Sequence, residues 1–189
     1  TTSRSTPFWR TDYQYGEPNG YQCHAYGLNL YLPLHGTAIY KTDSYTFRSG
    51  LGATAATSWE ITGKNGEPIY DIQKRIKDYK RIRPYSYGDY YPLTLPTKRY
   101  MNDNQWLAYQ LNRPEQKDGI ILAFRREKNI DEAIQVKLKG LVENARYELF
   151  YEDYGVCAIY TGKELMNGID IKIPTKPGSL LINYKVIGN

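Results

Sequence analysis

The sequence predicts a mainly β protein in two parts. An antiparallel β-sandwich is expected over residues 84–189, preceded over residues 1–83 by strand–helix structure of the kind that builds a (β/α)8 barrel. Short segments that alternate apolar and polar residues recur through the second part, with turn-forming residues between them. One strongly amphipathic helix pattern closes the first part. Tyrosine, which favours strands, contributes 20 of the 189 residues.

The strand signals of residues 84–189 have the spacing of an antiparallel sandwich. A turn-forming stretch over residues 112–119 separates the first two signals, and Gly, Pro and Asn stand between others. One helical turn is predicted over residues 163–166. The predicted strands are Trp106–Leu111, Ile120–Arg125, Ile134–Leu138, Tyr147–Tyr151, Ile169–Ile173 and Leu180–Val186.

A helix is predicted from about Pro68 to Arg83. Proline suits the first helical turn, and Pro84 ends the pattern because the residue before a proline avoids helical backbone angles. The apolar stripe consists of Ile69, Ile72, Ile76 and Tyr79, and the charged residues off it are Lys74, Arg75, Lys77, Asp78 and Lys80. We expect the stripe to face inward. Ile76→Asp would then lower the stability by several kcal/mol, and Lys77→Asp would change it little.

The rest of residues 1–83 is rich in glycine and small residues. It contains three short apolar runs, which are Tyr26–Leu34, Thr37–Tyr40 and Ser58–Ile61. The stretch Arg48–Thr57 between the last two predicts a short helix of small residues. A strand of small and apolar residues followed by an amphipathic helix is typical of one unit of a barrel. We therefore place a domain boundary near Pro84, with a barrel portion over 1–83 and a sandwich over 84–189.

Composition and charge argue against several classes of protein. The formal net charge is +5, but basic and acidic residues are interleaved rather than gathered in a stripe, so we expect no nucleic-acid partner. No apolar stretch approaches the length of a membrane span, so we expect no membrane partner. Cys23 and Cys157 lie too far apart for metal-ligand spacing, and we expect neither metal nor cofactor. Because the chain begins at Thr1 rather than Met, we expect a processed or truncated product.

Six segments follow one another in a specific order. They are Gln22–Gly36, Tyr45–Ser49, Lys80–Leu93, Trp106–Gln116, Ala123–Arg126 and Thr161–Leu165. Together they resemble segments of bacterial α-galactosidases (melibiases) of glycoside hydrolase family thirty-six. The resemblance implies a longer enzyme with an N-terminal β-sandwich, a catalytic (β/α)8 barrel and a C-terminal sandwich. This chain would hold the last barrel strands, the last barrel helix and the final sandwich.

The resemblance also implies a retaining hydrolase of terminal α-galactosides that uses two carboxyl groups. The family's nucleophilic Asp stands in a Lys-Trp-Asp type motif on an earlier barrel strand, and no segment of this chain matches that motif. We therefore expect the chain to be inactive alone and to need the upstream catalytic domain of the same protein. Open barrel edges would favour self-association into a homo-oligomer or another partner chain. A periplasmic or secreted location is favoured over a cytoplasmic one.

The segment Trp9–Tyr13 resembles the family's acid/base motif, which makes Asp12 the catalytic candidate. Tyr13 stands where the commoner pattern has a second Asp. Trp9 and Tyr13 are candidates for substrate binding, and their rings beside a second carboxylate would raise the pKa of Asp12 as an acid/base requires. Spacing alone favours a loop carboxylate or a helix N-cap for Asp12, and the resemblance favours the catalytic role.

Two histidines and one arginine complete the candidates. His24 lies in a run expected to end near the mouth of the barrel, where it would bind sugar hydroxyls or orient a carboxylate. A buried, hydrogen-bonded imidazole is the alternative for His24. We expect His35 to be structural and Arg48 to form a structural ion pair.

Two other functions compete with this one. The chain could be a fragment of an α-N-acetylgalactosaminidase, or a carbohydrate-binding or structural β-sandwich module of a multidomain glycosidase. A binding module should show an exposed row of aromatic residues on one sheet face. A packing domain should instead bury Trp106, Phe124 and Phe150.

Overall fold

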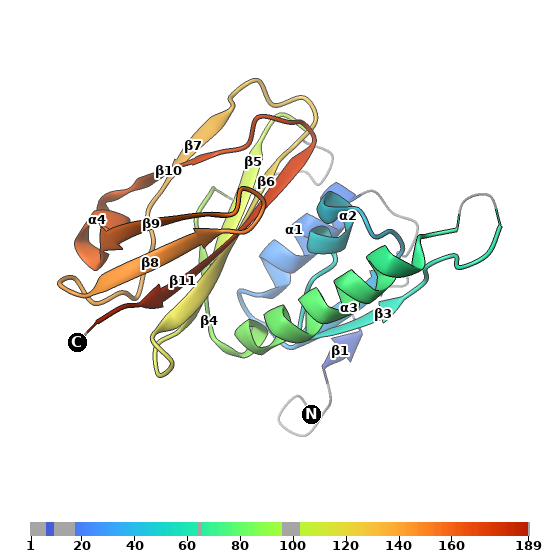
Figure 1. Ribbon diagram of the computed structural model, residues 1–189, viewed down its shortest axis with the longest axis horizontal. Helices are drawn as coiled ribbons and strands as arrows, with labels where there is room; N and C mark the ends of the chain where they lie inside the picture. The colour runs from blue at the N-terminus through green and yellow to red at the C-terminus, as the bar shows by residue number, and fades with distance from the viewer. Residues whose placement is uncertain (1–6, 10–17, 64–65, 96–102, 189) are drawn as a thin grey trace. The chain divides into compact units, whose positions relative to one another are not determined.

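A computed structural model of the protein describes residues 7–9, 18–63, 66–95 and 103–188. Contacts divide the chain into two compact units, Thr1–Tyr87 and Gly88–Asn189, which we call the first unit and the second unit (Figure 1).

The first unit alternates strands and helices. Its strands are β1 (Phe8–Trp9), β2 (His35–Ile39) and β3 (Thr54–Thr57), which pair in parallel in the order β1-β2-β3. Parallel neighbours need a crossover connection, because a tight turn cannot reverse the chain twice. The helices α1 (Pro18–Leu28) and α2 (Ser44–Ser49) follow β1 and β2, and α3 (Ile69–Ile82) follows β3 and continues into a 3₁₀ helix at Arg83–Tyr87. In Figure 1 the three α-helices lie beside the strands.

The expected helix over Arg48–Thr57 is wrong. The helix begins earlier because the Asp43 side chain accepts a hydrogen bond from the backbone N–H of Thr46 (2.9 Å) and so caps α2. The small residues at Thr54–Thr57 form a strand instead, since they pair with β2. A Cβ atom on Gly36 would lie 2.1 Å from the Thr54 carbonyl oxygen, so only glycine permits this approach.

The three apolar runs of the first unit have different structures. Thr37–Tyr40 overlaps β2, whereas Tyr26–Leu34 completes α1 and continues into the turn before β2. Ser58–Ile61 follows β3 and is neither helix nor strand. α1 has little amphipathic pattern, and polar contacts hold it to α2: Tyr45 donates to the Asn19 side chain (2.7 Å) and Gln22 donates to Ser49 (3.0 Å).

The predicted helix α3 is confirmed, but the residues that face inward differ from those expected. Arg75 and Ile82 are its buried residues, while Ile69 and Ile76 are 55% and 41% exposed. Ile72 and Tyr79 are half-buried. The inward stripe therefore runs through residues 72, 75, 79 and 82. The apolar residues of α3 cover a wider arc than the three-stranded sheet and α2 occupy, so Ile69 and Ile76 remain at its flank.

Arg75 is the polar centre of the first unit. Its Nε donates to the Thr42 carbonyl (2.6 Å), one terminal nitrogen donates to Ser44 (2.8 Å) and the other to Asp78 (3.1 Å). The guanidinium lies 5.1 Å from the centre of the Phe47 ring, a cation–π contact. Arg75 thus ties α3 to the loop that leaves the carboxyl end of β2.

The second unit is built from antiparallel strands, as predicted. One sheet has six strands in the order β4-β5-β6-β11-β8-β9, and a second sheet pairs β10 with β7. The strands are β4 (Asp89–Pro92), β5 (Trp106–Arg113), β6 (Asp118–Arg125), β7 (Ala133–Val136), β8 (Arg146–Tyr151), β9 (Val156–Thr161), β10 (Ile169–Lys172) and β11 (Gly178–Val186). A short helix, α4 (Gly162–Asn167), joins β9 to β10. The sequence did not predict β4 or β9.

The core of the second unit lies between its two sheets. Alternate residues of β5, β6, β8 and β11 point to one side, where they meet β7, β10 and Leu165 of α4. The buried members include Trp106, Ile121, Ala123, Leu149, Leu180 and Ile182 from the large sheet, and Val136, Ile169 and Ile171 from the small one. The predicted fold class, mainly β with an antiparallel sandwich, is confirmed for this unit.

A buried polar chain crosses this core. The Tyr184 hydroxyl accepts a hydrogen bond from the Gln110 amide nitrogen (2.7 Å) and donates to the Asn112 side-chain oxygen (2.8 Å). The Gln110 side chain also bonds both backbone groups of Lys139 (2.9 Å each). Tyr184 faces Gly119 across β11 and β6, where a Cβ atom would lie 2.1 Å from the tyrosine oxygen. These hydrogen-bonded side chains join β5, β11 and the segment after β7.

Replacing Arg75 tests its role in the first unit. Arg75→Met keeps a long unbranched side chain but removes the guanidinium, and with it the contact with Phe47 and the hydrogen bonds to Thr42 and Ser44. We expect the free energy of unfolding to fall by about 2–3 kcal/mol in urea denaturation. Lys77→Met, on the exposed side of α3, should change it by less than about 0.5 kcal/mol. Ile76→Asp should now cost less than Arg75→Met because Ile76 is partly exposed. Equal effects of Arg75→Met and Lys77→Met would contradict this role.

Replacing Tyr184 tests the polar chain of the second unit. Tyr184→Phe leaves Asn112 and Gln110 short of a partner and should lower the free energy of unfolding by about 1–3 kcal/mol. Burial raises the pKa of the Tyr184 hydroxyl above its usual value, so the folded protein keeps a proton that the unfolded chain releases near pH 10. Wild-type stability must therefore fall as pH rises above about 10. Denaturation at pH 8 and pH 11 should show a smaller difference between the two proteins at pH 11; an unchanged difference would argue against a buried, protonated hydroxyl.

Candidate functional site

Trp9 is the candidate site residue whose position in the sheet is defined best. It is the last residue of β1, pairs with Gly36 of β2 and is 39% exposed. In parallel α/β sheets and barrels, functional residues gather where the carboxyl ends of the strands meet. Asp12 and Tyr13 lie outside the residues that the structure describes, so their placement near Trp9 stays a prediction.

His24 is exposed on α1, so the alternative of a buried imidazole is wrong. The run that contains it leads to His35, which is the first residue of β2. The run therefore ends at the amino end of β2, and the carboxyl end of that strand is at Ile39. A contact of His24 with a sugar remains a prediction.

His35 and Arg48 are buried within the first unit. The His35 side chain is inaccessible to solvent, and its Nε2 lies 3.1 Å from the Asn29 side-chain oxygen. This bond links the start of β2 to the turn after α1, in line with the structural role expected for His35. Arg48 is 5% exposed on α2. Neither side chain is open to a ligand of the size of a sugar.

The described carboxylates near the carboxyl end of β2 serve the backbone. Asp43 caps α2, and Glu67 accepts hydrogen bonds from the backbone N–H (3.2 Å) and the hydroxyl of Thr42. Carboxylates held in this way keep loops in place and are poorly placed to exchange protons with a substrate. Asp12 thus stays the candidate for acid/base chemistry.

The sheet of the first unit has two unlike faces. Ile39, Ala55 and Thr57 face Phe47 of α2 and the helix α3, and together they border a groove of about 570 Å³. The register of β2 and β3 turns Gly36, Ala38, Thr54 and Ala56 to the opposite face. In a closed (β/α)8 barrel the face turned away from the helices is the interior, which side chains from the strands fill.

The groove beside α3 is a feature that the sequence did not reveal. It is lined by Trp59, Ile76, Tyr79, Arg83 and Tyr87 among others, and no carboxylate lines it. The indole N–H of Trp59 is buried without a hydrogen-bond partner among the described residues. Burial raises the pKa of the Tyr79 hydroxyl, which lies 3.5 Å from the Gly52 carbonyl oxygen. An apolar groove next to the edge strand β3 has the character of a packing surface rather than a reaction site.

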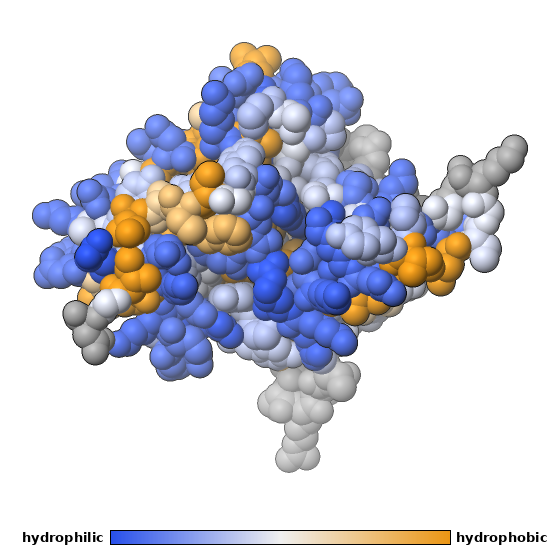
Figure 2. Space-filling model, viewed as in Figure 1, coloured by the Kyte–Doolittle hydropathy of each residue, from blue (hydrophilic) through white to orange (hydrophobic). Residues whose placement is uncertain are grey.

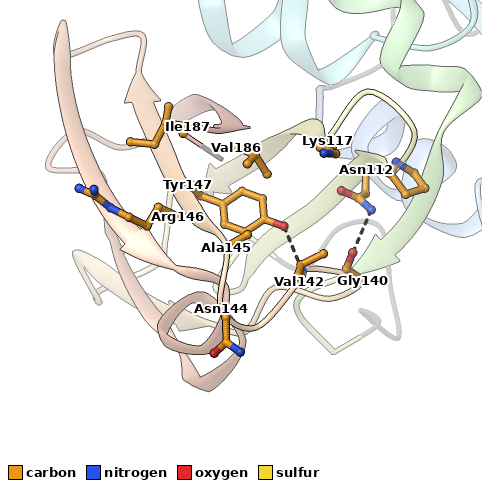
Figure 3. Close-up of a pocket in the computed structure, with 12 residues that line it drawn as sticks. Asn112, Lys117, Gly140, Val142, Asn144, Ala145, Arg146, Tyr147, Val186 and Ile187 are labelled. Carbon is orange, nitrogen blue, oxygen red and sulfur yellow. Dashed lines mark hydrogen bonds between the residues drawn. The ribbon is translucent and has the colours of Figure 1, made fainter.

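A second pocket, of about 550 Å³, lies at one end of the second unit (Figure 3). Asn112 and Lys117 lie on one side of it and Tyr147, Ala145 and Val186 on the other. The Tyr147 hydroxyl accepts a hydrogen bond from the Val142 N–H (3.0 Å), and Asn112 donates to the Gly140 carbonyl (3.4 Å). Among the residues that the structure describes, no carboxylate lines this pocket, so they offer no pair of groups for glycoside hydrolysis.

The aromatic residues that distinguish a binding module from a packing domain are mostly buried. Trp106 and Phe124 are 6% and 0% exposed, and the Trp106 N–H donates to the Asp131 carbonyl (3.2 Å). Phe150 is 39% exposed and departs from the pattern expected of a packing domain. It lies on β8 next to the sheet edge, among exposed aliphatic rather than aromatic neighbours. Over the described residues, the second unit therefore favours packing over sugar binding.

The described residues contain no group of three or more histidine, cysteine, aspartate or glutamate side chains that could hold a metal ion. None of the described helices is long and apolar enough to span a bilayer.

Known proteins resemble this chain in fold but not closely in sequence. No protein-family model and no curated protein matches it. Among solved structures, the galactosidase domain of the α-galactosidase–sucrose kinase AgaSK aligns with a TM-score of 0.71 and 18% identity, over 97% of this chain and 26% of that one. A variant of the GH36 α-galactosidase AgaA from Geobacillus stearothermophilus, in complex with raffinose, aligns with a TM-score of 0.68 and 17% identity, over 90% and 25%.

The GH36 α-galactosidase AgaB from the same organism aligns with a TM-score of 0.58 and 19% identity, over 82% of this chain and 22% of that one. The chain thus spans about a quarter of the length of these neighbours. At this level of identity the likeness establishes the fold: the chain has the fold of part of these GH36 α-galactosidases.

Proposed function

We propose that this chain is the C-terminal part of a retaining α-galactosidase that hydrolyses terminal α-galactosides. The observation that carries the proposal is the likeness over 97% of the chain, across both units, to about a quarter of a galactosidase domain. A chance likeness of the sandwich alone would leave the β–α alternation of the first unit unmatched. The six resembling segments supply a second line of support, since they are spread through both units.

In this proposal the first unit is the last portion of the catalytic barrel. Its strands are parallel, each is followed by a helix, and Trp9 marks a carboxyl strand end, where barrel enzymes carry their functional residues. The nucleophile and the remaining strands belong to the upstream part of the protein. The second unit would then be a structural domain, as its buried Trp106 and Phe124 suggest.

Asp12 is the acid/base in this proposal. A retaining glycosidase holds two carboxyl groups about 5–5.5 Å apart. One attacks the anomeric carbon, while Asp12 gives its proton to the leaving oxygen. Asp12 then takes a proton from the water that hydrolyses the glycosyl–enzyme intermediate, which restores both groups. Trp9, Tyr13 and His24 would contact the sugar, and raffinose-type oligosaccharides are the substrates to test.

The role of Asp12 can be tested in the full-length protein that carries this chain. Asp12→Asn should lower turnover of raffinose by about 10²- to 10⁴-fold, because the leaving sugar needs protonation. Cleavage of the glycosidic bond in p-nitrophenyl α-galactoside should suffer less, since its leaving group needs little. Asp170→Asn, an exposed change on β10, should leave both rates unaltered. Near-normal raffinose turnover by Asp12→Asn would remove Asp12 from this role.

The expected inactivity can be tested on the 189-residue chain by itself. It should show no turnover of p-nitrophenyl α-galactoside above background, because one carboxylate cannot both form and hydrolyse the intermediate. Turnover by the chain that disappears in Asp12→Asn would mean that it holds a complete site, contrary to the proposal. The same assay with an α-N-acetylgalactosaminide, made on the full-length protein, separates the galactosidase from the closest rival function.

A further inference from the structure

Strand β9 is an unprotected edge of the large sheet. It lies last in the order β4-β5-β6-β11-β8-β9 and has the sequence VCAIYT over Val156–Thr161. Soluble proteins normally protect such edges with charged residues, proline or a bulge, since an open edge can pair with another chain. The six residues of β9 include neither a charge nor a proline, and all of them favour strands except alanine and cysteine.

The backbone groups that point outward from this edge can be identified. The N–H of Glu152 bonds the Leu181 carbonyl (3.0 Å), so the even-numbered residues of β8 bond toward β11. Successive residues of an antiparallel strand bond to opposite sides, so Tyr147, Leu149 and Tyr151 bond to β9. Their partners in the register are Tyr160, Ala158 and Val156. This leaves the N–H and C=O groups of Cys157 and Ile159 directed away from the sheet.

An apolar patch accompanies these groups. Phe150 pairs with Cys157, and Ile159 follows two residues later on the same face. Phe150 and Ile159 are 39% and 52% exposed, and Cys157 is exposed. In Figure 2, hydrophobic residues gather over β8 and β9. The edge therefore offers hydrogen-bonding groups and an apolar surface side by side.

We propose that β9 is a self-association surface, on which β9 of a second copy of this chain pairs antiparallel. In the favoured register Ala158 lies on the twofold axis, and Cys157 stands opposite Ile159 of the partner subunit. Each such pair exchanges two backbone hydrogen bonds, so the two symmetric pairs satisfy all the open groups of Cys157 and Ile159 on both copies. The two large sheets then join into one continuous sheet.

The sequence of the edge favours a second copy over another occupant. A twofold contact uses one patch twice, and it closes without leaving a further edge free. This register places Cys157 beside Phe150 on one side and the partner's Ile159 on the other, so the two apolar patches merge. A shift by two residues in one direction would set Cys157 opposite the partner's Thr161, whose N–H already donates to Glu164. The opposite shift would set Ile159 opposite the partner's Gly155, in the turn before β9. The register centred on Ala158 therefore pairs the open groups of Cys157 and Ile159 with one another.

Analytical ultracentrifugation of the 189-residue chain tests the proposed β9 surface by measuring the dissociation constant of the dimer. We expect a dimer whose dissociation constant rises at least about 10-fold in Ile159→Lys, because a charge on an edge strand opposes pairing. Ile130→Lys, at an exposed site outside β9, should leave it unchanged. Ile76→Lys removes an apolar group from the groove of the first unit, the other surface that could associate. A monomer at all concentrations would overturn the proposal, as would a dimer that Ile76→Lys weakens and Ile159→Lys does not.

Disulfide trapping tests the register without relying on a destabilising change. In a chain with Cys23→Ser and Cys157→Ser, Ala158→Cys places two thiols across the twofold axis as a non-hydrogen-bonded pair with Cα atoms about 4.5 Å apart, within disulfide range. The natural Cys157 and its copy would stand on a diagonal, about 7–8 Å apart, and should cross-link more slowly. Faster trapping through Cys157 than through Ala158→Cys would overturn the register. Neither ultracentrifugation nor disulfide trapping depends on catalytic activity, so a negative result in either would not bear on the proposed function.

Discussion

Buried strands must have their N–H and C=O groups paired, and this requirement determines the layout of both units. In the first unit the strands run parallel, so a helix has to carry the chain back after each one. In the second unit they run antiparallel, and short turns or α4 are enough. At two of the outer strands, β3 and β9, apolar side chains remain exposed or border a groove. Open strand edges, rather than pockets rich in carboxylates, are the features that indicate contact with another polypeptide.

Inside each unit, a single buried polar side chain satisfies several hydrogen-bonding groups that would otherwise be unpaired. Arg75 holds the carbonyl of Thr42 and the hydroxyl of Ser44, and it thereby determines where the loop after β2 runs. In the core of the second unit, the Tyr184 hydroxyl bonds the side chains of both Gln110 and Asn112 and so joins β11 to β5. In both cases a single side chain satisfies partners from elements that are distant in sequence. Removing it leaves the partners buried and unpaired, which costs more than the lost bond itself is worth.

The proposed function and the fold draw on different kinds of support. Short segments in order suggested the family, and the fold agrees at 17–19% identity with one part of GH36 α-galactosidases. No complete pair of catalytic carboxylates is needed in a quarter of such an enzyme. The first unit supplies a strand end with Trp9, and the assignment of Asp12 depends on experiment. The β9 edge is independent of that chemistry, since it concerns how copies of the chain meet.

The sequence by itself determined the elements whose signals are local. The bounds of α3 follow from Pro68, Pro84 and the periodic residues between them. The alternation in β8 and β10 shows in the sequence because one face of each strand is buried in the core. β5 and β6 are buried on both faces and are mostly apolar along their length. The strands β4 and β9 were missed, since their sequences do not alternate apolar and polar residues; in β9 exposed positions such as Val156 and Ile159 are apolar too.

Tertiary structure decided the rest. It chose a strand rather than a helix for Thr54–Thr57, because pairing with Gly36 outweighs the weak preference of small residues. It turned Arg75 inward and left Ile76 at the flank, because the guanidinium can stack on the Phe47 ring and still donate to a carbonyl, which no apolar pattern reveals. It also placed His24 on an exposed helix and Phe150 near an open edge. Which residues meet across a fold depends on partners far away in the chain, and local periodicity carries no information about them.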